Sequence, residues 1–220
     1  MVVRVWDAPT RLFHWLLALC FVGLLITSQV GGMAMEWHFR FGYGVLTLLL
    51  FRLLWGVLGG HWSRFSSFVV GPIGVLRYLQ GRGKPHDGVG HNPLGALSVL
   101  AMLLFLSLQV ASGLMSDDEI AAAGPLTRFV SSAWVATATY YHKDIGKLIL
   151  LGLVALHLSA IAFYYFRKNE NLLKPMITGD KSLPLPVRSA RDGWSERSRA
   201  ALIFLLCAAL VGGAVLGLNG

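Results

Sequence analysis

Charged residues and cysteines are both scarce in this sequence of 220 residues. Asp, Glu, Lys and Arg make up only 14% of the chain, whereas hydrophobic residues make up 55% and the mean hydropathy is +0.61. Soluble globular domains carry about 25% charged residues. The composition therefore excludes an ordinary soluble domain and indicates a polytopic membrane protein.

The two cysteines, Cys20 and Cys207, both fall within apolar stretches. The sequence has no Cys-x-x-Cys-His motif, which excludes covalent attachment of a c-type haem, and no Cys-x-x-Cys pair for an iron–sulfur cluster or zinc. We interpret both cysteines as small buried apolar residues.

Five apolar stretches are long enough to cross a membrane, which takes about 20 residues. They cover about residues 11–30, 39–58, 94–115, 143–166 and 200–218. The first stretch follows Arg4, Asp7 and Arg11 and lacks a small-residue cleavage site, so we do not expect a cleavable signal peptide. Asp7 and Pro9 form a typical helix start. The connection at 116–141 is expected to be an interfacial hairpin or a short helix.

The net charge of +8 reflects topology rather than binding to nucleic acid. Basic residues gather before the first stretch, between the second and third, and after the fourth. Under the positive-inside rule, these connections are cytoplasmic. The N-terminus is therefore predicted in the cytoplasm and the C-terminus in the periplasm.

Four of the seven histidines lie in or at the start of apolar stretches, namely His14, His38, His142 and His157. Ionisable side chains within a membrane are costly and usually functional, and neutral imidazole is a common metal and haem ligand. His38 and His142 each open a stretch at the outer side. His14 follows Arg4 by ten residues and His157 precedes Arg167 by ten, which is about 15 Å of helix in each case.

The depths of these histidines match in pairs on antiparallel helices. His142 and His157 are separated by fifteen residues, which is about 22 Å of rise and roughly 60° from a whole number of turns, so both can face the interior of a bundle. Four-helix bundles build cofactor sites from facing helices. The spacing predicts two haems, an outer one held by His38 and His142 and an inner one held by His14 and His157.

Two other interpretations of the four histidines stay open at this stage. They are a metal or proton pathway, and hydrogen bonds between helices. Glycines near the ligands would let a flat macrocycle approach the backbone; they are Gly23, Gly42, Gly44, Gly113, Gly146 and Gly152.

Five further residues are candidates for contacts with a cofactor. Arg52, inside the second stretch, is expected to bind a haem propionate or lipid phosphates. Arg40 and Lys143 flank the outer ligands and are expected to pair with the propionates of the outer haem or to extend their charged ends to the membrane–water interface. His91 could contact a propionate or a quinone carbonyl, with a helix-start role as the alternative. Arg11 lies at the same inner end.

Four segments together resemble the bacterial cytochrome b561 family. They read VWDAPTRLFHWLLA, HFRFGYGVLTLLLFRLLWG, GHNPLGAL and HKDIGKLILLGLVALH, and the likeness extends over about residues 1–181 to the ITGDK near 177. It is greatest to the b-type cytochrome subunit of nickel–iron hydrogenases and its stand-alone relatives. The resemblance implies a four-helix membrane bundle with two b haems that passes electrons between an outer redox partner and the quinone pool. It also implies ligands at His14, His38, His142 and His157.

We therefore expect an all-α protein of the bacterial inner membrane with a dihaem domain at 1–181, a basic cytoplasmic linker at 182–199 and an additional transmembrane helix at 200–220. The fifth helix should be dispensable for haem binding, because all four ligands precede it. The expected partners are quinone and a periplasmic hydrogenase small subunit or cytochrome c. A homodimer or trimer, and whether the chain is itself an enzyme, stay open.

Two alternative functions also stay open. One is a self-contained oxidoreductase that acts on superoxide or a ferric chelate. The other is a haem-free transporter of metal ions or protons lined by histidines.

Overall fold

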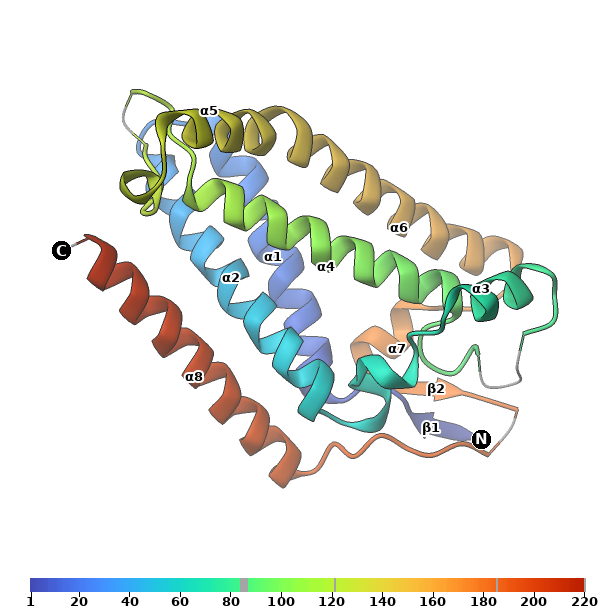
Figure 1. Ribbon diagram of the computed structural model, residues 1–220. Coiled ribbons are helices and arrows are strands. Elements are labelled where there is room, and N and C mark those ends of the chain that lie inside the picture. Colours follow the sequence, from blue (N-terminus) through green and yellow to red (C-terminus); the bar gives the residue numbers. More distant parts are fainter. Residues whose placement is uncertain (84–86, 121, 185, 220) are drawn as a thin grey trace. The chain divides into compact units, whose positions relative to one another are not determined.

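The computed structural model describes residues 1–83, 87–120, 122–184 and 186–219, and within them the chain is predominantly helical (Figure 1). In this described part, five helices are long and apolar enough to cross a membrane. They are α1 (Ala8–Val30), α2 (Ala34–Leu58), α4 (Pro93–Leu114), a continuous helix that joins α5 (Ser132–Tyr140) to α6 (Lys147–Arg167), and α8 (Trp194–Asn219).

The remaining elements are short. They are β1 (Val2–Arg4), α3 (Pro72–Leu79), α7 (Leu173–Thr178), β2 (Asp180–Ser182) and 3-10 turns at His61–Ser63, Phe65–Ser67 and Thr127–Phe129. Strands β1 and β2 pair antiparallel (Figure 1), with Val3 opposite Lys181.

The fourth spanning helix begins earlier than the sequence indicated. Ser131 caps α5 by accepting a hydrogen bond from the Trp134 N–H, and α5 continues through a π-helical turn, Tyr141–Gly146, into α6. The hydroxyls of Thr137 and Thr139 donate to carbonyls four residues back, at 2.9 and 2.8 Å. These bonds give the polar threonine side chains hydrogen-bond partners within the helix itself. A search for apolar runs therefore starts the span too late in the sequence.

Helix α8 likewise begins at Trp194 rather than at 200. The division into a linker at 182–199 and a final helix remains a prediction, but the last six residues of that range are helical.

The chain forms two compact units, and the boundaries fall inside the long helices. Unit 1 comprises Met1–Phe13, Arg52–Ala101 and Leu153–Leu202; unit 2 comprises His14–Phe51, Met102–Gly152 and Ile203–Gly220.

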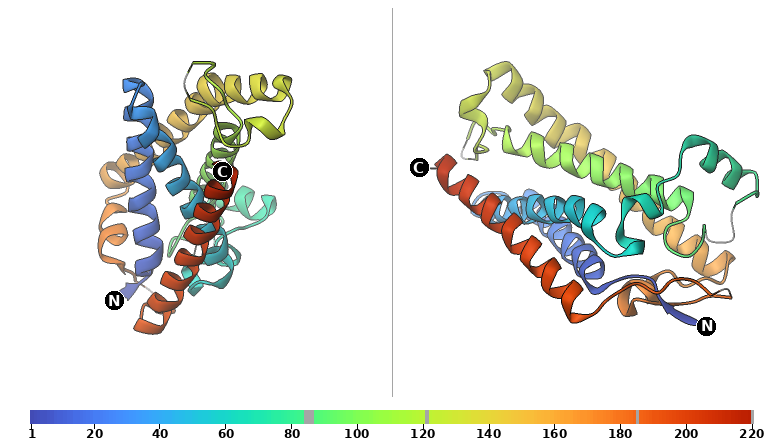
Figure 2. Two further views of the ribbon diagram at one scale, coloured as in Figure 1. Left: turned by 90° about the vertical axis from the view of Figure 1, so that its left-hand side faces the viewer. Right: turned by 60° about the horizontal axis from the view of Figure 1, so that its bottom comes forward.

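Unit 1 has an aromatic core to which the segment before α8 contributes. Its buried residues are Val5, Trp6, Trp62, Val89 and Ala190, with Met176, Leu183 and Val187 packed against them. The Ala190 N–H donates to the Arg4 carbonyl at 2.7 Å, and this segment runs beside β1 in Figure 2. The Trp62 indole donates to the Arg188 carbonyl, also at 2.7 Å. Leu183, Val187 and Ala190 are thus packed into the unit, and Arg188 is bonded to it through its carbonyl.

The start of α1 confirms the predicted cap. Asp7 accepts the Thr10 N–H at 2.9 Å. Its carboxylate is 0% exposed and also accepts hydrogen bonds from Trp55 Nε1 at 3.2 Å and Ser63 Oγ at 2.6 Å. Three donors offset the cost of burying this charge.

In unit 2, α1 and α2 are joined by a tight turn at Gly31 and Gly32, whose φ angles are +66° and +54°. Glycine adopts this left-handed region without steric cost. The chain reverses there, and Phe41 of α2 fits against Gly23 of α1, where a Cβ would lie 2.7 Å from the Phe41 ring.

Candidate haem-binding site

His38 is held by the C-terminal half of α1. Its Nδ1 lies 3.1 Å from the Leu24 carbonyl and 3.2 Å from Thr27 Oγ1. A carbonyl oxygen can only accept, so the bond to Leu24 requires the proton on Nδ1. The lone pair of His38 is then on Nε2, the nitrogen that is free to bind a metal.

His142 lies in the π-helical turn and is held in the same way by α4. Its Nδ1 lies 2.8 Å from the Gln109 carbonyl and 3.3 Å from Ser112 Oγ. The bond to a carbonyl again selects the tautomer with a lone pair on Nε2. Hydrogen bonds from the second nitrogen to a carbonyl are typical of metal-bound histidines, because they fix the tautomer and orient the ring.

The two imidazole rings lie next to each other within unit 2, in an edge arrangement. Their centroids are 6.2 Å apart and their planes are inclined at 84°. Two imidazoles bound to opposite sides of one iron have ring centres roughly 6 Å apart, because each metal–nitrogen bond is about 2 Å long. The spacing and tautomers of His38 and His142 therefore fit a haem held by two histidines.

The other predicted pair falls in separate units. His14 belongs to unit 2, where its ring meets Trp15 edge-on at a centroid distance of 5.0 Å, and His157 belongs to unit 1. Both side chains are half-buried. Their pairing stays a prediction.

The glycines near the ligands have different surroundings. A Cβ on Gly42 would meet nothing within 4 Å, which leaves space for a flat group. A Cβ on Gly113 would lie 2.7 Å from His142 Cε1, and one on Gly146 would overlap the side chains of Gln109 and Tyr141. Gly113 and Gly146 therefore make room for protein side chains, so the macrocycle-approach role predicted for them is wrong.

Arg40 and Lys143, the residues beside the outer pair, are both exposed. Arg40 pairs with Glu36 one turn earlier, and its guanidinium lies 4.8 Å from the centroid of the Trp37 ring. Their predicted contacts with propionates stay predictions.

Arg52 and Arg11 both lie in unit 1 and bind backbone carbonyls. Arg52 is buried, donates to the Ser63 carbonyl at 3.0 Å and stacks on Phe65 at 4.6 Å. Arg11 donates to the Ile177 carbonyl at 2.6 Å. These contacts give both arginines a structural role in addition to the cofactor or quinone contacts predicted for them.

His91 in unit 1 packs between two aromatic rings. The centroids of Trp6 and Phe68 each lie 4.7 Å from that of His91. The neighbouring Asn92 accepts the Gly95 N–H through its side chain at 2.8 Å, which confirms a helix start at this point.

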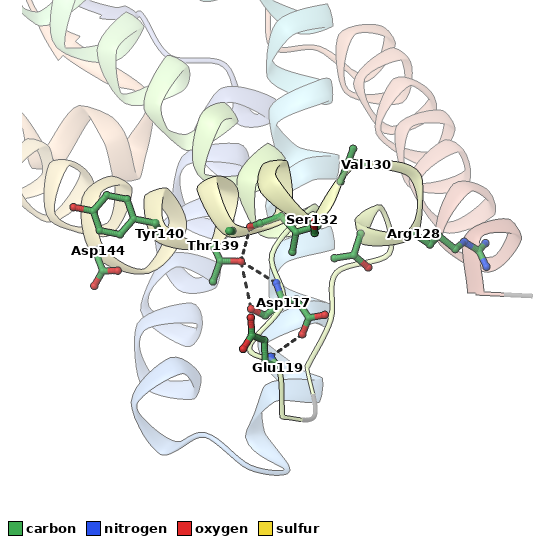
Figure 3. Close-up of a pocket in the computed structure, with 11 residues that line it drawn as sticks. Asp117, Glu119, Arg128, Val130, Ser132, Thr139, Tyr140 and Asp144 are labelled. Carbon is green, nitrogen blue, oxygen red and sulfur yellow. Dashed lines mark hydrogen bonds between the residues drawn. The ribbon is translucent and has the colours of Figure 1, made fainter.

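A cavity of about 710 Å³ lies beside α5 in unit 2 (Figure 3). Asp117, Glu119 and Asp144 give it an acidic character, and Arg128 is the basic residue of its lining. Asp117 is fixed by Thr139, whose hydroxyl accepts the Asp117 N–H at 3.0 Å. Among the described residues, no three His, Cys, Asp or Glu side chains are grouped so that they could hold a bare metal ion.

The residues that hold the histidine rings were not identified from the sequence. Thr27, Gln109 and Ser112 are polar residues within apolar helices, and that pattern alone is the signal that could have indicated them. Leu24 acts through its carbonyl, which no side-chain pattern reveals.

The sequence matches the family model for prokaryotic cytochrome b561 over residues 5–179. A relative in Bradyrhizobium diazoefficiens, described as a probable Ni/Fe-hydrogenase B-type cytochrome subunit, is 23% identical over 81% of this chain and 85% of its own length. A relative of similar description in Escherichia coli K12 is 26% identical over 52% of this chain and 60% of its own length. Another in Azotobacter vinelandii is 31% identical over 46% of this chain and 53% of its own length. No solved structure matches the chain.

The family match covers most of the chain, including all four histidines in membrane-length helices, and it agrees with the helical membrane architecture. The chain belongs to the prokaryotic cytochrome b561 family and is a multi-pass membrane b-type cytochrome that works in electron transfer.

Proposed function

We propose that this protein is a dihaem cytochrome that carries electrons between a periplasmic redox partner and the quinone pool of the inner membrane. The observation that carries the proposal is the pair His38 and His142, whose rings are 6.2 Å apart. Each ring has Nδ1 tied to a backbone carbonyl and Nε2 left for iron. The second haem is assigned to His14 and His157 on the basis of their matched depth in the sequence.

The side chains in unit 2 determine how the iron would be bound. Haem supplies a one-electron couple when it is bound. The carbonyls of Leu24 and Gln109 hold the Nδ1 protons of His38 and His142. Such hydrogen bonds increase the basicity of the imidazole ligand and thereby adjust the properties of the metal that it binds. The apolar helices around the rings limit access of water, which also influences the redox potential.

The periplasmic partner is proposed to be of the hydrogenase type, with cytochrome c as the alternative. The support comes from the relatives, whose descriptions associate them with Ni/Fe-hydrogenase. We assign the contact to the region around α5, where the cavity of Figure 3 exposes Asp117, Glu119 and Arg128. This assignment follows the predicted topology, with the N-terminus in the cytoplasm and residues 116–141 outside.

Quinone is proposed to bind in unit 1, near Arg11, Arg52 and His91. Both arginines already donate to carbonyls, and each guanidinium has further N–H donors. The His91 ring lies between Trp6 and Phe68, and aromatic surfaces of this kind suit a planar ring.

The test is to purify the full-length protein from membranes and to quantify its haem. We expect two haems per chain that are extracted by acid–acetone, reduced by dithionite and reoxidised by a short-chain quinone. A chain without haem, or with haem that resists extraction, would overturn the proposal. Reoxidation by superoxide or a ferric chelate, but not by quinone, would instead favour a self-contained oxidoreductase.

A further inference from the structure

Gln109 of α4 holds the proposed haem ligand His142 at two points. Its backbone carbonyl accepts the His142 Nδ1–H at 2.8 Å. Its side-chain Nε2 donates to the His142 carbonyl at 2.9 Å. One residue thus contacts both the ring and the backbone of His142, which restricts how the ring can turn relative to the helix that carries it.

The backbone around His142 is unusual. Residues Tyr141–Gly146 form a π-helical turn between α5 and α6. Such turns are rare and occur frequently at functional sites. Gly146 closes this turn against α4, because a Cβ there would overlap Gln109 Oε1 and approach Tyr141 Cε1 to 2.7 Å. The Gln109 side chain therefore reaches His142 only because residue 146 has no side chain.

The ring of His142 rests on the same turn of α4. Ser112 Oγ lies 3.3 Å from Nδ1, and a Cβ on Gly113 would lie 2.7 Å from Cε1. One turn of α4, residues 109–113, thus contacts the ring through the Gln109 carbonyl, the Ser112 hydroxyl and Gly113.

Two buried polar atoms beside residues 109–113 show that glutamine at position 109 is not the most stable choice for this site. Gln109 Oε1 and Tyr141 Oη have no hydrogen-bond partner among the described protein atoms. A buried polar group without a partner destabilises the folded state. An apolar residue of the same length at position 109 would remove the cost of Oε1 along with the bond to His142. Stability alone therefore does not account for glutamine at this position.

We propose that Gln109 is a positioning residue that sets the orientation of the His142 ring and thereby the properties of the haem that His142 binds. The inference rests on the proposed function, in which His142 is an axial ligand. It goes further, because it assigns a specific effect to a residue that does not contact the iron.

The main test is Gln109→Met, which keeps the length of the side chain and removes its donor. The full-length protein would be purified and the two haems followed separately by redox titration. The ferric signal would be recorded by electron paramagnetic resonance, since its anisotropy depends on the angle between the two axial imidazole planes, 84° here. Ser107→Ala on the same helix is the control, because, among the described residues, its hydroxyl bonds only to the Leu103 carbonyl within that helix.

We expect Gln109→Met to keep both haems and its thermal stability, while the anisotropy of one ferric signal and the midpoint potential of that haem change. Ser107→Ala should match the parent protein in every measurement. A Gln109→Met protein whose two signals and two potentials are unchanged would overturn the proposal. So would a variant whose signals and potentials stay at parental values while its thermal stability falls, because that result describes a structural role.

A second variant covers the case in which Gln109→Met does not accumulate in the membrane. Gly146→Ala leaves Gln109 in place and displaces its side chain, so it should alter the same ferric signal; Gly212→Ala, which has open space around it, is its control. An unaltered signal in Gly146→Ala would overturn the proposal. Failure of the proposed function is recognised separately, since the parent protein would then contain no haem or His142→Ala would lose none.

Discussion

Units 1 and 2 use their buried polar groups differently. In unit 1, Asp192 pairs with both Arg4, at 2.9 Å, and Arg197, at 3.1 Å, and Arg52 and Arg11 donate to backbone carbonyls. In unit 2 the buried hydrogen bonds converge on the two imidazole rings of His38 and His142. In unit 1 these contacts hold parts of the fold together, whereas in the proposed function those of unit 2 orient the axial ligands His38 and His142. Substitution of Asp192 in unit 1 should therefore change mainly the stability of the fold, whereas substitution of His38 or His142 in unit 2 should change mainly the haem.

The largest expected effect is the loss of one haem. His142→Ala and His38→Ala should each remove the same spectral component and leave the other, because both rings belong to one site. Haem per chain, measured as pyridine haemochrome, should fall by about half in either variant. His61→Ala is the control in unit 1, where the His61 ring contacts Trp62, and it should retain both haems. Loss of different components in His38→Ala and His142→Ala would disprove the pairing.

Truncation tests whether the segment before α8 belongs to unit 1. A chain that ends at Gly193 loses Arg197 but keeps Ala190 in the aromatic core and the Asp192–Arg4 ion pair, so it should retain both haems. A chain that ends at Ser182 loses these contacts and should accumulate much less in the membrane. Haem per chain and the yield of folded protein would be compared between the two. Equal yields would show that residues 183–193 are a dispensable linker after all.

In both units, what could be predicted from the sequence depends on the rarity of the residue in its context and on how far apart in the sequence the contacting residues lie. His38 and His142 were identified because imidazole in an apolar stretch is rare and costly. The cap at Asp7 was identified because it is local in the sequence. Gln109 acts on a residue 33 positions away and Asp192 on residues more than 180 positions away. Contacts at such distances depend on packing, which no local pattern encodes.

The π-helical turn could not be predicted from the sequence either, and it changes the angle expected between His142 and His157. The angle between His142 and His157 was calculated for a regular α-helix, but the interval between them begins with the π-helical turn Tyr141–Gly146. The value of roughly 60° therefore does not apply to this interval. The choice of the four histidines does not depend on it.

A smaller effect is expected for Asp192→Asn, which weakens the charge network of unit 1. The Asp192 side chain is 3% exposed, and it also caps α1 by accepting the Ala8 N–H at 3.0 Å. Burial raises the pKa of Asp192, but the hydrogen bonds from Arg197, Ala8 and Arg4 outweigh burial and hold that pKa below its usual range. The substitution should lower the free energy of unfolding by about 2 kcal/mol at neutral pH, which is typical of hydrogen bonds to a charged group.

The pH dependence of this effect follows from the direction of the shift. A carboxylate with a lowered pKa in the folded state contributes stability above its unfolded pKa, about 3.9, and loses it as the pH falls through the folded value. The parent protein should therefore lose stability below about pH 4, and Asp192→Asn should lose less over that range. Thermal unfolding in detergent between neutral and acidic pH measures both. Parallel curves for the two proteins would contradict the assignment.

The smallest effect is expected at Tyr78 of α3, also in unit 1. Burial and the hydrogen bond with Tyr164, at 3.4 Å between the two hydroxyls, raise the pKa of Tyr78 to about 12. The stability that this group contributes is complete below the unfolded pKa of about 10 and is lost as the pH rises toward the folded value. Tyr78→Phe should lower the free energy of unfolding by less than about 1 kcal/mol, because one long neutral hydrogen bond is lost.

Tyr78→Phe should also leave both haem potentials unchanged, because the Tyr78 hydroxyl bonds to Tyr164 rather than to one of the four proposed axial histidines. The parent protein should lose more stability than the variant between about pH 10 and 12, a difference that thermal unfolding in alkaline buffers can resolve. A change in either haem potential at neutral pH would contradict the division of roles between the two units, even with the fold intact. It would mean that α3 and Tyr164 act on a haem, and that hydrogen bonds in unit 1 also determine ligand properties.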